Sequence, residues 1–330
     1  MVDEARLSTA ARRLRDTIEP VVGQVYFAPE CHDEYVALGF APSPFTSDRV
    51  AMPDGSAYFT SRGSCLGQVP GEVVAAAFAV FNPAAVVPSV AFGWSLTDSG
   101  TIAGARARGA VGQLRRIVGD EPSGLARARE LLERATDQLR PEGRPLYAGL
   151  LSLGLPGDPL GDVWRLGDLL REYRGDAHTA AWVAAGLDAP SIGLLTELYW
   201  GIPMRTYVRT RAWSDEQLDA AEEQLRQRGL LDGDGFSPAG RALREGIEVA
   251  TDRQMAGAIS ALGDDADELY DILRPWGDAI RAAGGYPGNP GVLLRGRRGR
   301  RATPPVAPAP AAATPCSRPS RRDCGRSTAR

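Results

Sequence analysis

Apolar residues recur at helical spacing along most of the chain, and this pattern predicts an almost entirely helical protein. Helices are expected, among other places, near residues 100–118, 123–139, 159–174 and 176–186. Alternating stretches long enough for a sheet are absent from the sequence, apart from one short hairpin. The predicted fold class is therefore all-α, beginning with an N-terminal helical bundle in a domain over residues 1–187.

A second pattern begins at Ser214. Ser214 followed three residues later by Gln217 forms a capping box that opens a helix, and Gly229 supplies the left-handed residue that ends it. The letters DGDGF that follow predict the tight tip of a β-hairpin. Ser237–Pro238 then starts another helix as N-cap and first helical residue. With a helix upstream, this order predicts a winged helix-turn-helix unit with a short β-hairpin wing, in a domain over residues 188–285.

Several stretches resemble known families. LRQRGLLDGDGFSPAGRALREGIE resembles the recognition helix, wing and following helix of MarR-like winged-helix proteins. Over residues 1–283 the chain is similar to an actinobacterial group of helix-turn-helix family proteins, through YFAPE, YFTSRGSCLG, FNP, LREYRGDAHTAAWVAAGLDA and the segment just quoted. The resemblance implies DNA binding by the recognition helix and a role in transcription regulation.

Charge is distributed unevenly along the chain. All 38 basic residues are arginine, a bias that indicates a GC-rich coding sequence. From Arg295 to Arg330, ten arginines and one aspartate give a net charge of +9, which leaves −12 for residues 1–294 out of a total of −3. An acidic body repels phosphate and argues against non-specific nucleic-acid binding. Residues 286–330 are rich in Arg, Pro and Ala and are expected to be a disordered tail, either a basic arm or an extension without function.

The predicted recognition helix also carries the wrong charge for DNA. It has five carboxylates against two arginines, and the wing adds Asp232 and Asp234. Bringing carboxylates near phosphates is costly even after screening by salt. Three neighbouring arginines are the candidate contacts to a nucleic-acid backbone: Arg205, Arg209 and Arg211. These charges leave DNA binding open but disfavour it, and favour a packing or dimerisation role, which leaves a homodimer open.

The stretch from Trp164 to Trp182 places an acid, an arginine and a histidine between two tryptophans on one helix face. Such a face suits a small apolar or anionic ligand, and tyrosines of YFAPE and YFTSR are expected to line the same cavity. The candidate ligand-binding residues are Tyr26, Glu30, Tyr58, Arg62, Trp164, Asp168, Arg171, Arg174, Asp176, His178 and Trp182. The alternative is structural, a buried Arg–Asp pair and a hydrogen-bonded histidine that brace two helices. Gly175 is expected to interrupt the helix, so that Asp176 caps its second half.

No metal site or cofactor is expected. The run from Glu30 to Glu34 has metal-binding residue types, but on a helix they point in all directions. The motifs of P-loop, dinucleotide-binding, serine-hydrolase and zinc-protease enzymes are absent from the sequence. Four cysteines without C-x-x-C spacing, and no run of 18 apolar residues, indicate a cytoplasmic protein that does not enter a membrane.

The expected function is therefore that of a non-enzymatic protein that binds a small ligand and carries a winged-helix domain, as in a ligand-responsive transcriptional regulator. The alternative is an enzyme with a polar site around His178, Arg174 and Asp176.

Overall fold

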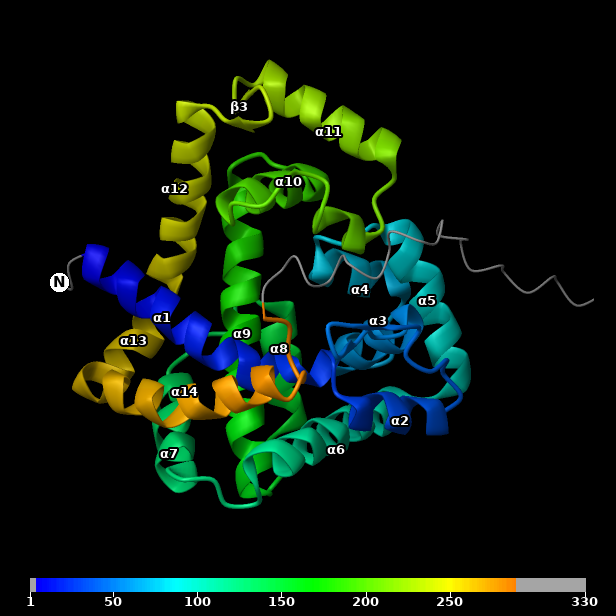
Figure 1. Ribbon diagram of the computed structural model, residues 1–330, viewed down its shortest axis with the longest axis vertical. Coiled ribbons are helices and arrows are strands. Elements are labelled where there is room, and N and C mark those ends of the chain that lie inside the picture. Colours follow the sequence, from blue (N-terminus) through cyan, green and yellow to red (C-terminus); the bar gives the residue numbers. More distant parts are fainter. Residues whose placement is uncertain (1–3, 289–330) are drawn as a thin grey trace, which may run out of the picture. The chain divides into compact units, whose positions relative to one another are not determined.

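The computed structural model describes residues 4–288, most of which are helical (Figure 1). The α-helices are α1 (Glu4–Gly23), α2 (Pro29–Ala37), α3 (Gly55–Gly63), α4 (Gly71–Phe78), α5 (Pro83–Leu96), α6 (Ser99–Val118), α7 (Leu125–Asp137), α8 (Pro145–Leu153), α9 (Pro159–Ala184), α10 (Ala189–Tyr199), α11 (Asp215–Gln227), α12 (Pro238–Gln254), α13 (Ala256–Leu262) and α14 (Ala266–Ala282). Short 3-10 helices are η1 (Gln24–Tyr26), η2 (Ser64–Leu66), η3 (Val208–Arg211) and η4 (Gly263–Asp265). The mostly helical character predicted from the sequence is confirmed.

Among the described residues, the strands form two small antiparallel hairpins. β1 (Thr46–Ser47) pairs with β2 (Val50–Ala51), within a stretch where no strand was predicted. β3 (Leu231–Asp232) pairs with β4 (Gly235–Phe236), which is the hairpin predicted from DGDGF. Each strand is two residues long, so these hairpins are turns with a short ladder rather than sheets.

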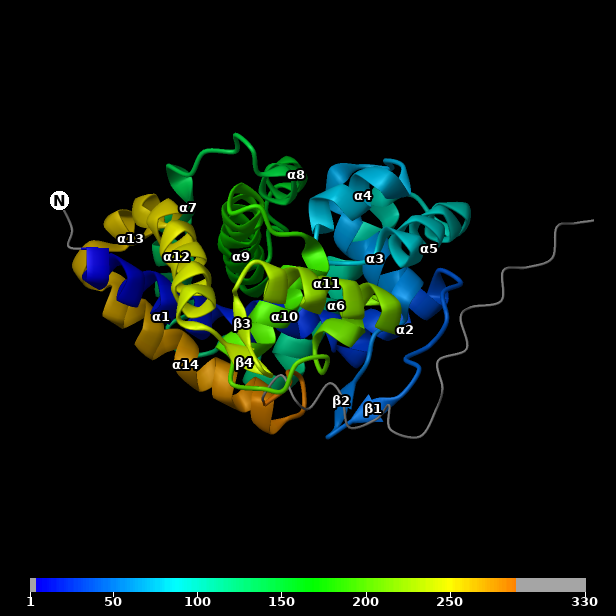
Figure 2. The same ribbon diagram turned by 90° about the horizontal axis from the view of Figure 1, so that it is seen from above.

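Helix α9 runs through the middle of the larger hydrophobic core (Figure 1). Helices α1, α7, α8 and α12 all pack against it. Leu14 and Ile18 of α1 are buried in the same core as Leu170 of α9, and burying such side chains contributes about 1.5–3 kcal/mol each. Helix α14 lies along the other side of α1 (Figures 1 and 2). This arrangement places α1 and α9 next to each other, and ion pairs connect α9 to α1 and α12.

The expected interruption of this helix at Gly175 is wrong. Helix α9 is continuous over 26 residues and includes Gly175. It begins with Asp158 as N-cap and Pro159 at its first position. Its burial on several sides, by α1, α7, α8 and α12, stabilises a continuous helix at the modest cost of one interior glycine. Asp176 therefore does not cap a second half-helix. Its carboxylate accepts hydrogen bonds from the first turn of α8 instead.

A smaller core joins the end of α9 to α10, α11 and the start of α12. Its buried residues run from Trp182 to Ile247, whereas those from Met255 to Ile280, in and around α13 and α14, belong to the larger core. The division into domains at residues 1–187 and 188–285 stays a prediction, because these two cores are in contact through α9 and α12.

The local signals predicted for the second unit are confirmed. Ser214 and Gln217 form the capping box of α11, and Gly229 has φ +68°. The Ser237 side chain accepts a hydrogen bond from Gly240 N at the start of α12. Gly240 itself is required by packing, since a Cβ there would lie 1.9 Å from the Leu230 carbonyl oxygen.

The predicted tail lies almost wholly outside the described residues. Tyr286, its first residue, is packed edge-on against Phe27 and donates a hydrogen bond to Glu19 at 2.9 Å, so it belongs to the folded part. Within residues 4–288, no helix combines the length and apolarity needed to cross a membrane.

Candidate functional site: a charged cavity between α1 and α9

A cavity of about 200 Å³ lies between α1 and α9. It is lined by Leu14, Arg15, Ile18, Glu19, Arg62, Leu170, Arg171, Glu172, Arg174, Gly175, His178 and Met255. Four of the predicted ligand-binding residues are therefore on its wall: Arg62, Arg171, Arg174 and His178. The lining groups comprise four arginines against two glutamates, above a floor of aliphatic side chains.

Glu172 is the buried acceptor at one end of this cavity. Arg62 of α3 donates to both of its oxygens, Nε to Oε1 at 3.0 Å and Nη2 to Oε2 at 2.8 Å. Arg171 adds a third hydrogen bond at 2.9 Å and also donates to Glu19 at 3.0 Å. Burial alone would raise the pKa of Glu172, but the adjacent Arg62 and Arg171 lower it to about 2. The carboxylate is therefore charged and firmly held at neutral pH.

Behind Glu172 lies a second buried pair. Arg106 of α6 donates to Asp168 at 2.8 Å, and both side chains are almost wholly buried. Tyr26 connects this pair to the cavity, because its hydroxyl lies 3.4 Å from both Arg106 and Glu172. Asp168 and Trp164 thus belong to the core rather than to the cavity wall. The structural alternative, a buried Arg–Asp pair, describes Asp168 correctly, although its partner is Arg106.

Trp164 is in cation–π contact with two arginine side chains. The guanidinium carbons of Arg106 and Arg165 are each 5.0 Å from its ring centroid. Arg165 is buried, and its Nε and Nη1 have no hydrogen-bond partner within residues 4–288. Burial lowers the pKa of Arg165. Cation–π contact with Trp164 offsets part of this desolvation cost.

Beside the cavity, α12 supplies two carboxylates that pair with the lining residue Arg174. Arg174 of α9 donates from Nη2 to Glu248 at 2.9 Å and to Asp252 at 3.0 Å. Glu248 also accepts from Arg244 at 2.7 Å, and Asp252 accepts from Arg12 of α1 at 2.7 Å. Burial would raise the pKa of Glu248, but Arg244 and Arg174 lower it to about 2. These ion pairs join α1, α9 and α12 around one charged cluster.

His178 lies beside this cluster on the cavity wall. Its Nδ1 is 3.1 Å from the Thr251 hydroxyl and 3.9 Å from Glu248. Burial lowers the pKa of His178 to about 4, and the neighbouring Arg244 and Arg174 act in the same direction. His178 is thus neutral at physiological pH, and it can accept or donate a hydrogen bond.

The remaining predicted ligand-binding residues lie elsewhere. Glu30 pairs with Arg116 on the surface. Tyr58 packs among Tyr26, Phe59, Phe78 and Phe81, although its hydroxyl is 3.4 Å from Arg62. Trp182 is buried in the smaller core.

Asp176 is buried at the start of α8, where its Oδ2 accepts from the backbone N–H groups of Leu146 and Tyr147 at 3.1 and 3.0 Å. Burial raises the pKa of Asp176 to about 6. Because it faces α8, Asp176 does not join His178 and Arg174 in one polar site, and this geometry does not support the enzymatic alternative.

The three arginines proposed for nucleic-acid contact are engaged within the chain. Arg205 pairs with Asp219 at 2.6 Å and with Glu222, both on α11. Arg209 pairs with Asp215 at 2.6 Å. Arg211 lies over the rings of Phe81 and Tyr207, 4.4 Å from each centroid. The first two are thus neutralised by the carboxylates of α11.

Sequence reasoning missed a junction at FNP. Asn82 caps α5, and its Nδ2 donates to the Ala212 carbonyl and to Gln217 Oε1, both at 3.0 Å. Trp213 donates back to the Val80 carbonyl at 3.0 Å. The turn between η3 and α11 is therefore bonded to the helical bundle. An asparagine before a proline signals a helix cap, but it gives no sign of the distant partner.

Sequence reasoning also missed Glu19 and Glu172 on the cavity wall, and Glu248 and Asp252 on α12, which pair with Arg174 beside it. In the part of the chain that the structure describes, no group of three or more His, Cys, Asp or Glu side chains is placed to hold a metal ion.

The model of one family, described as the Helix-turn-helix family, matches residues 11–287. No curated protein and no solved structure matches with statistical significance.

Proposed function

The chain belongs to the Helix-turn-helix family, and on this premise we propose that it is a ligand-responsive regulator that binds a small anion in the cavity between α1 and α9. The observation that carries the proposal is the position of α12, which begins at the hairpin of the helix-turn-helix unit and ends in the charged cluster beside the cavity. One rigid helix thus connects a ligand site to a recognition unit.

The cavity wall favours an anion. Four guanidinium groups from α1, α3 and α9 face two carboxylates there, and His178 is neutral. Arg174 Nε is buried without a hydrogen-bond partner in the described region. Guanidinium groups bind carboxylates through paired hydrogen bonds, and the aliphatic floor of Leu14, Ile18 and Met255 suits a short apolar part. The proposed ligand is therefore a small carboxylate.

Transmission to the recognition unit would follow from the ion pairs on α12. An anion that attracts Arg174 competes with Glu248 and Asp252 for the same guanidinium. Because those carboxylates lie on α12, a change in this pairing alters how α12 packs on α9. The ligand would then bind one packing of α12 on α9 more tightly than the other, and allosteric coupling requires such a difference in binding free energy between two states.

For the unit itself we propose a winged helix-turn-helix arrangement. The order of the elements supports it: η3 is followed by a turn with Ala212 at φ +64°, then by α11 and the β3–β4 hairpin. Family membership favours DNA as the target. The exposed carboxylates of α11 oppose that contact, and Arg205 and Arg209 would have to leave their α11 partners to reach a phosphate backbone.

Isothermal titration of the full chain with butyrate, succinate and benzoate tests the ligand site. We expect at least one of them to bind with a Kd below about 1 mM. Arg15→Gln removes a cavity arginine that pairs with the exposed Asp16 at 2.8 Å and lies 3.7 Å from the buried Glu248. Glu248 keeps Arg174 and Arg244 as partners, so the variant should fold and bind at least tenfold more weakly. Arg108→Gln, at an exposed pair on α6, is the matched control and should bind normally.

The proposal fails if none of the three carboxylates binds the native chain, or if Arg15→Gln binds as tightly as the native chain does.

A further inference from the structure

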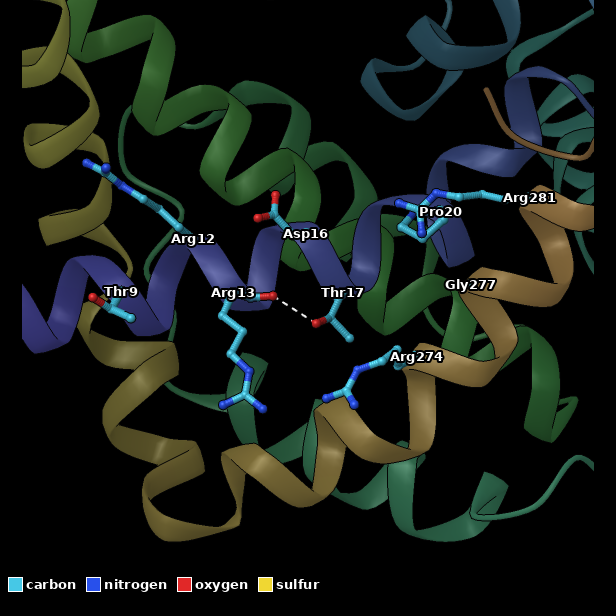
Figure 3. A pocket seen from close by; sticks show the side chains of 9 residues that line it. All are labelled: Thr9, Arg12, Arg13, Asp16, Thr17, Pro20, Arg274, Gly277 and Arg281. Carbon is cyan, nitrogen blue, oxygen red and sulfur yellow. Dashed lines mark hydrogen bonds between the residues drawn. The ribbon is translucent and has the colours of Figure 1, made fainter. Parts of the chain in front are cut away.

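We propose that a groove between α1 and α14 binds a phosphate group, either as free phosphate or as a phosphate monoester, through Arg13 and Arg274. The groove measures about 560 Å³ and lies on the opposite side of α1 from the carboxylate cavity, so this inference does not rest on the proposed function. Figure 3 shows the groove with the side chains that line it.

Two arginines reach into the groove from facing helices. Arg13 extends from α1 toward α14, and Arg274 extends from α14 into the same space (Figure 3). Arg12 turns the other way, toward α12, where Asp252 and Glu245 hold it at 2.7 and 2.6 Å. Asp16 points away from α14, and it pairs with Arg15 at 2.8 Å (Figure 3). Two guanidinium groups thus lie close to the groove, while the carboxylate on its wall is turned aside.

The two helices are held in place independently of any ligand. A Cβ at Gly277 of α14 would lie 2.8 Å from Pro20 Cγ of α1, so the helices meet closely at that point. Tyr270 of α14 donates to the Ala10 carbonyl at 3.3 Å, and its ring lies 4.4 Å below the Arg13 guanidinium. The groove is therefore preformed, and binding there costs little reorganisation.

The present partners of both arginines are weak competitors. Arg13 pairs with Asp267, and Arg274 pairs with Asp271 at 2.9 Å, but these carboxylates are 72% and 68% exposed. Exposed pairs of this kind contribute about 0–1 kcal/mol. Within residues 4–288, Arg13 uses only Nη1 and Arg274 only Nη2 for these hydrogen bonds. The other N–H donors of each guanidinium remain for a phosphate, which accepts paired hydrogen bonds and carries more charge than one carboxylate.

Titration calorimetry with inorganic phosphate and with glycerol 3-phosphate, at constant ionic strength set with chloride, tests the proposal on the full chain. We expect saturable binding of at least one of the two, and their relative affinities tell a free-phosphate site from a monoester site. The double variant Arg13→Gln/Arg274→Gln should weaken binding at least tenfold. Both side chains are about half exposed, so the variant should fold, and its thermal melting checks this. The control Arg108→Gln should bind as the native chain does.

Arg274→Lys keeps the charge but loses the planar fork, so it should retain weaker binding than the native chain and stronger binding than the double variant. The proposal is overturned if neither phosphate compound binds the native chain, or if the folded double variant binds with unchanged affinity.

Discussion

Arg174 of α9 donates from Nη2 to Glu248 of α12 across 2.9 Å, and both side chains are nearly buried. The same nitrogen also donates to Asp252, one turn further along α12. Two turns of α12 are thereby fixed to the wall of the cavity, while the opposite end of the helix begins at the β-hairpin. The proposed coupling between the cavity and the helix-turn-helix unit depends on that connection.

Replacing Arg174 with Gln should destabilise the chain by about 1.5–3 kcal/mol, because each of the buried carboxylates Glu248 and Asp252 loses one of its charged hydrogen-bond donors and keeps only the other. Urea unfolding measures the change. The control is Arg253→Gln, which breaks the exposed pair with Glu4 and should cost less than about 1 kcal/mol. Equal losses in the two variants would contradict the role given to Arg174.

Stability should depend on the titration of His178. Burial lowers its pKa to about 4, below the value near 6.5 expected for the unfolded chain, so the unfolded chain binds more protons between these values. His178 therefore contributes stability above about pH 6.5 that is lost as the pH falls toward 4. His178→Gln should flatten the decline of the unfolding free energy between pH 7 and pH 4.5. Burial also lowers the pKa of His32. Because His32 is present in both proteins, its contribution to the pH dependence is the same in both curves. Parallel curves for the two proteins would sink this prediction.

Asp176 should behave in the opposite sense. Burial raises its pKa to about 6, so the folded chain binds more protons than the unfolded chain between about pH 4 and pH 6, and stability falls as the pH rises through this window. Asp176→Asn keeps an oxygen acceptor for Leu146 N and Tyr147 N without the charge. We expect thermal unfolding at pH 7 to show a variant at least as stable as the native chain. Asp176→Ala, which lacks the acceptor, should be about 1 kcal/mol less stable than Asp176→Asn.

Asn82→Ala should loosen the turn before α11. The change removes the cap of α5 and two hydrogen bonds to Ala212 and Gln217, at a cost of about 2 kcal/mol. Faster amide exchange is expected in residues 211–217. Asp98→Ala, which removes the cap of α6 alone, is the matched control and should leave that segment unchanged. If both variants exchange alike there, the Asn82 junction has no special role.

Local structure could be predicted well from the sequence. The capping box at Ser214 and Gln217, the glycine end of α11 and the Ser237–Pro238 start of α12 all depend on residues within one turn of each other. Short-range hydrogen bonds and backbone preferences decide such features, so the residue types within that turn are enough to predict them. The unbroken α9 was not predictable in this way, because surrounding helices outweigh the weak helix propensity of Gly175.

The site could be predicted only in part. Arg171 and His178, which were placed on one helix face from their spacing, both line the cavity between α1 and α9. It assigned Asp168 to that face too, but Asp168 is buried against Arg106, which lies 62 residues away in the chain. The ion-pair partners of α9 come from α1, α3, α6, α7 and α12, and periodicity within one helix carries no information about which arginine meets which acid.

Hydrogen exchange of the full chain, with and without saturating butyrate, succinate or benzoate, whichever binds, tests the central claim most directly. If a ligand in the cavity is sensed through α12, exchange should change both in α9 and in residues 208–254, which include α11, the hairpin and α12. A change confined to α1 and α9, with residues 208–254 unaffected at full saturation, would contradict the account.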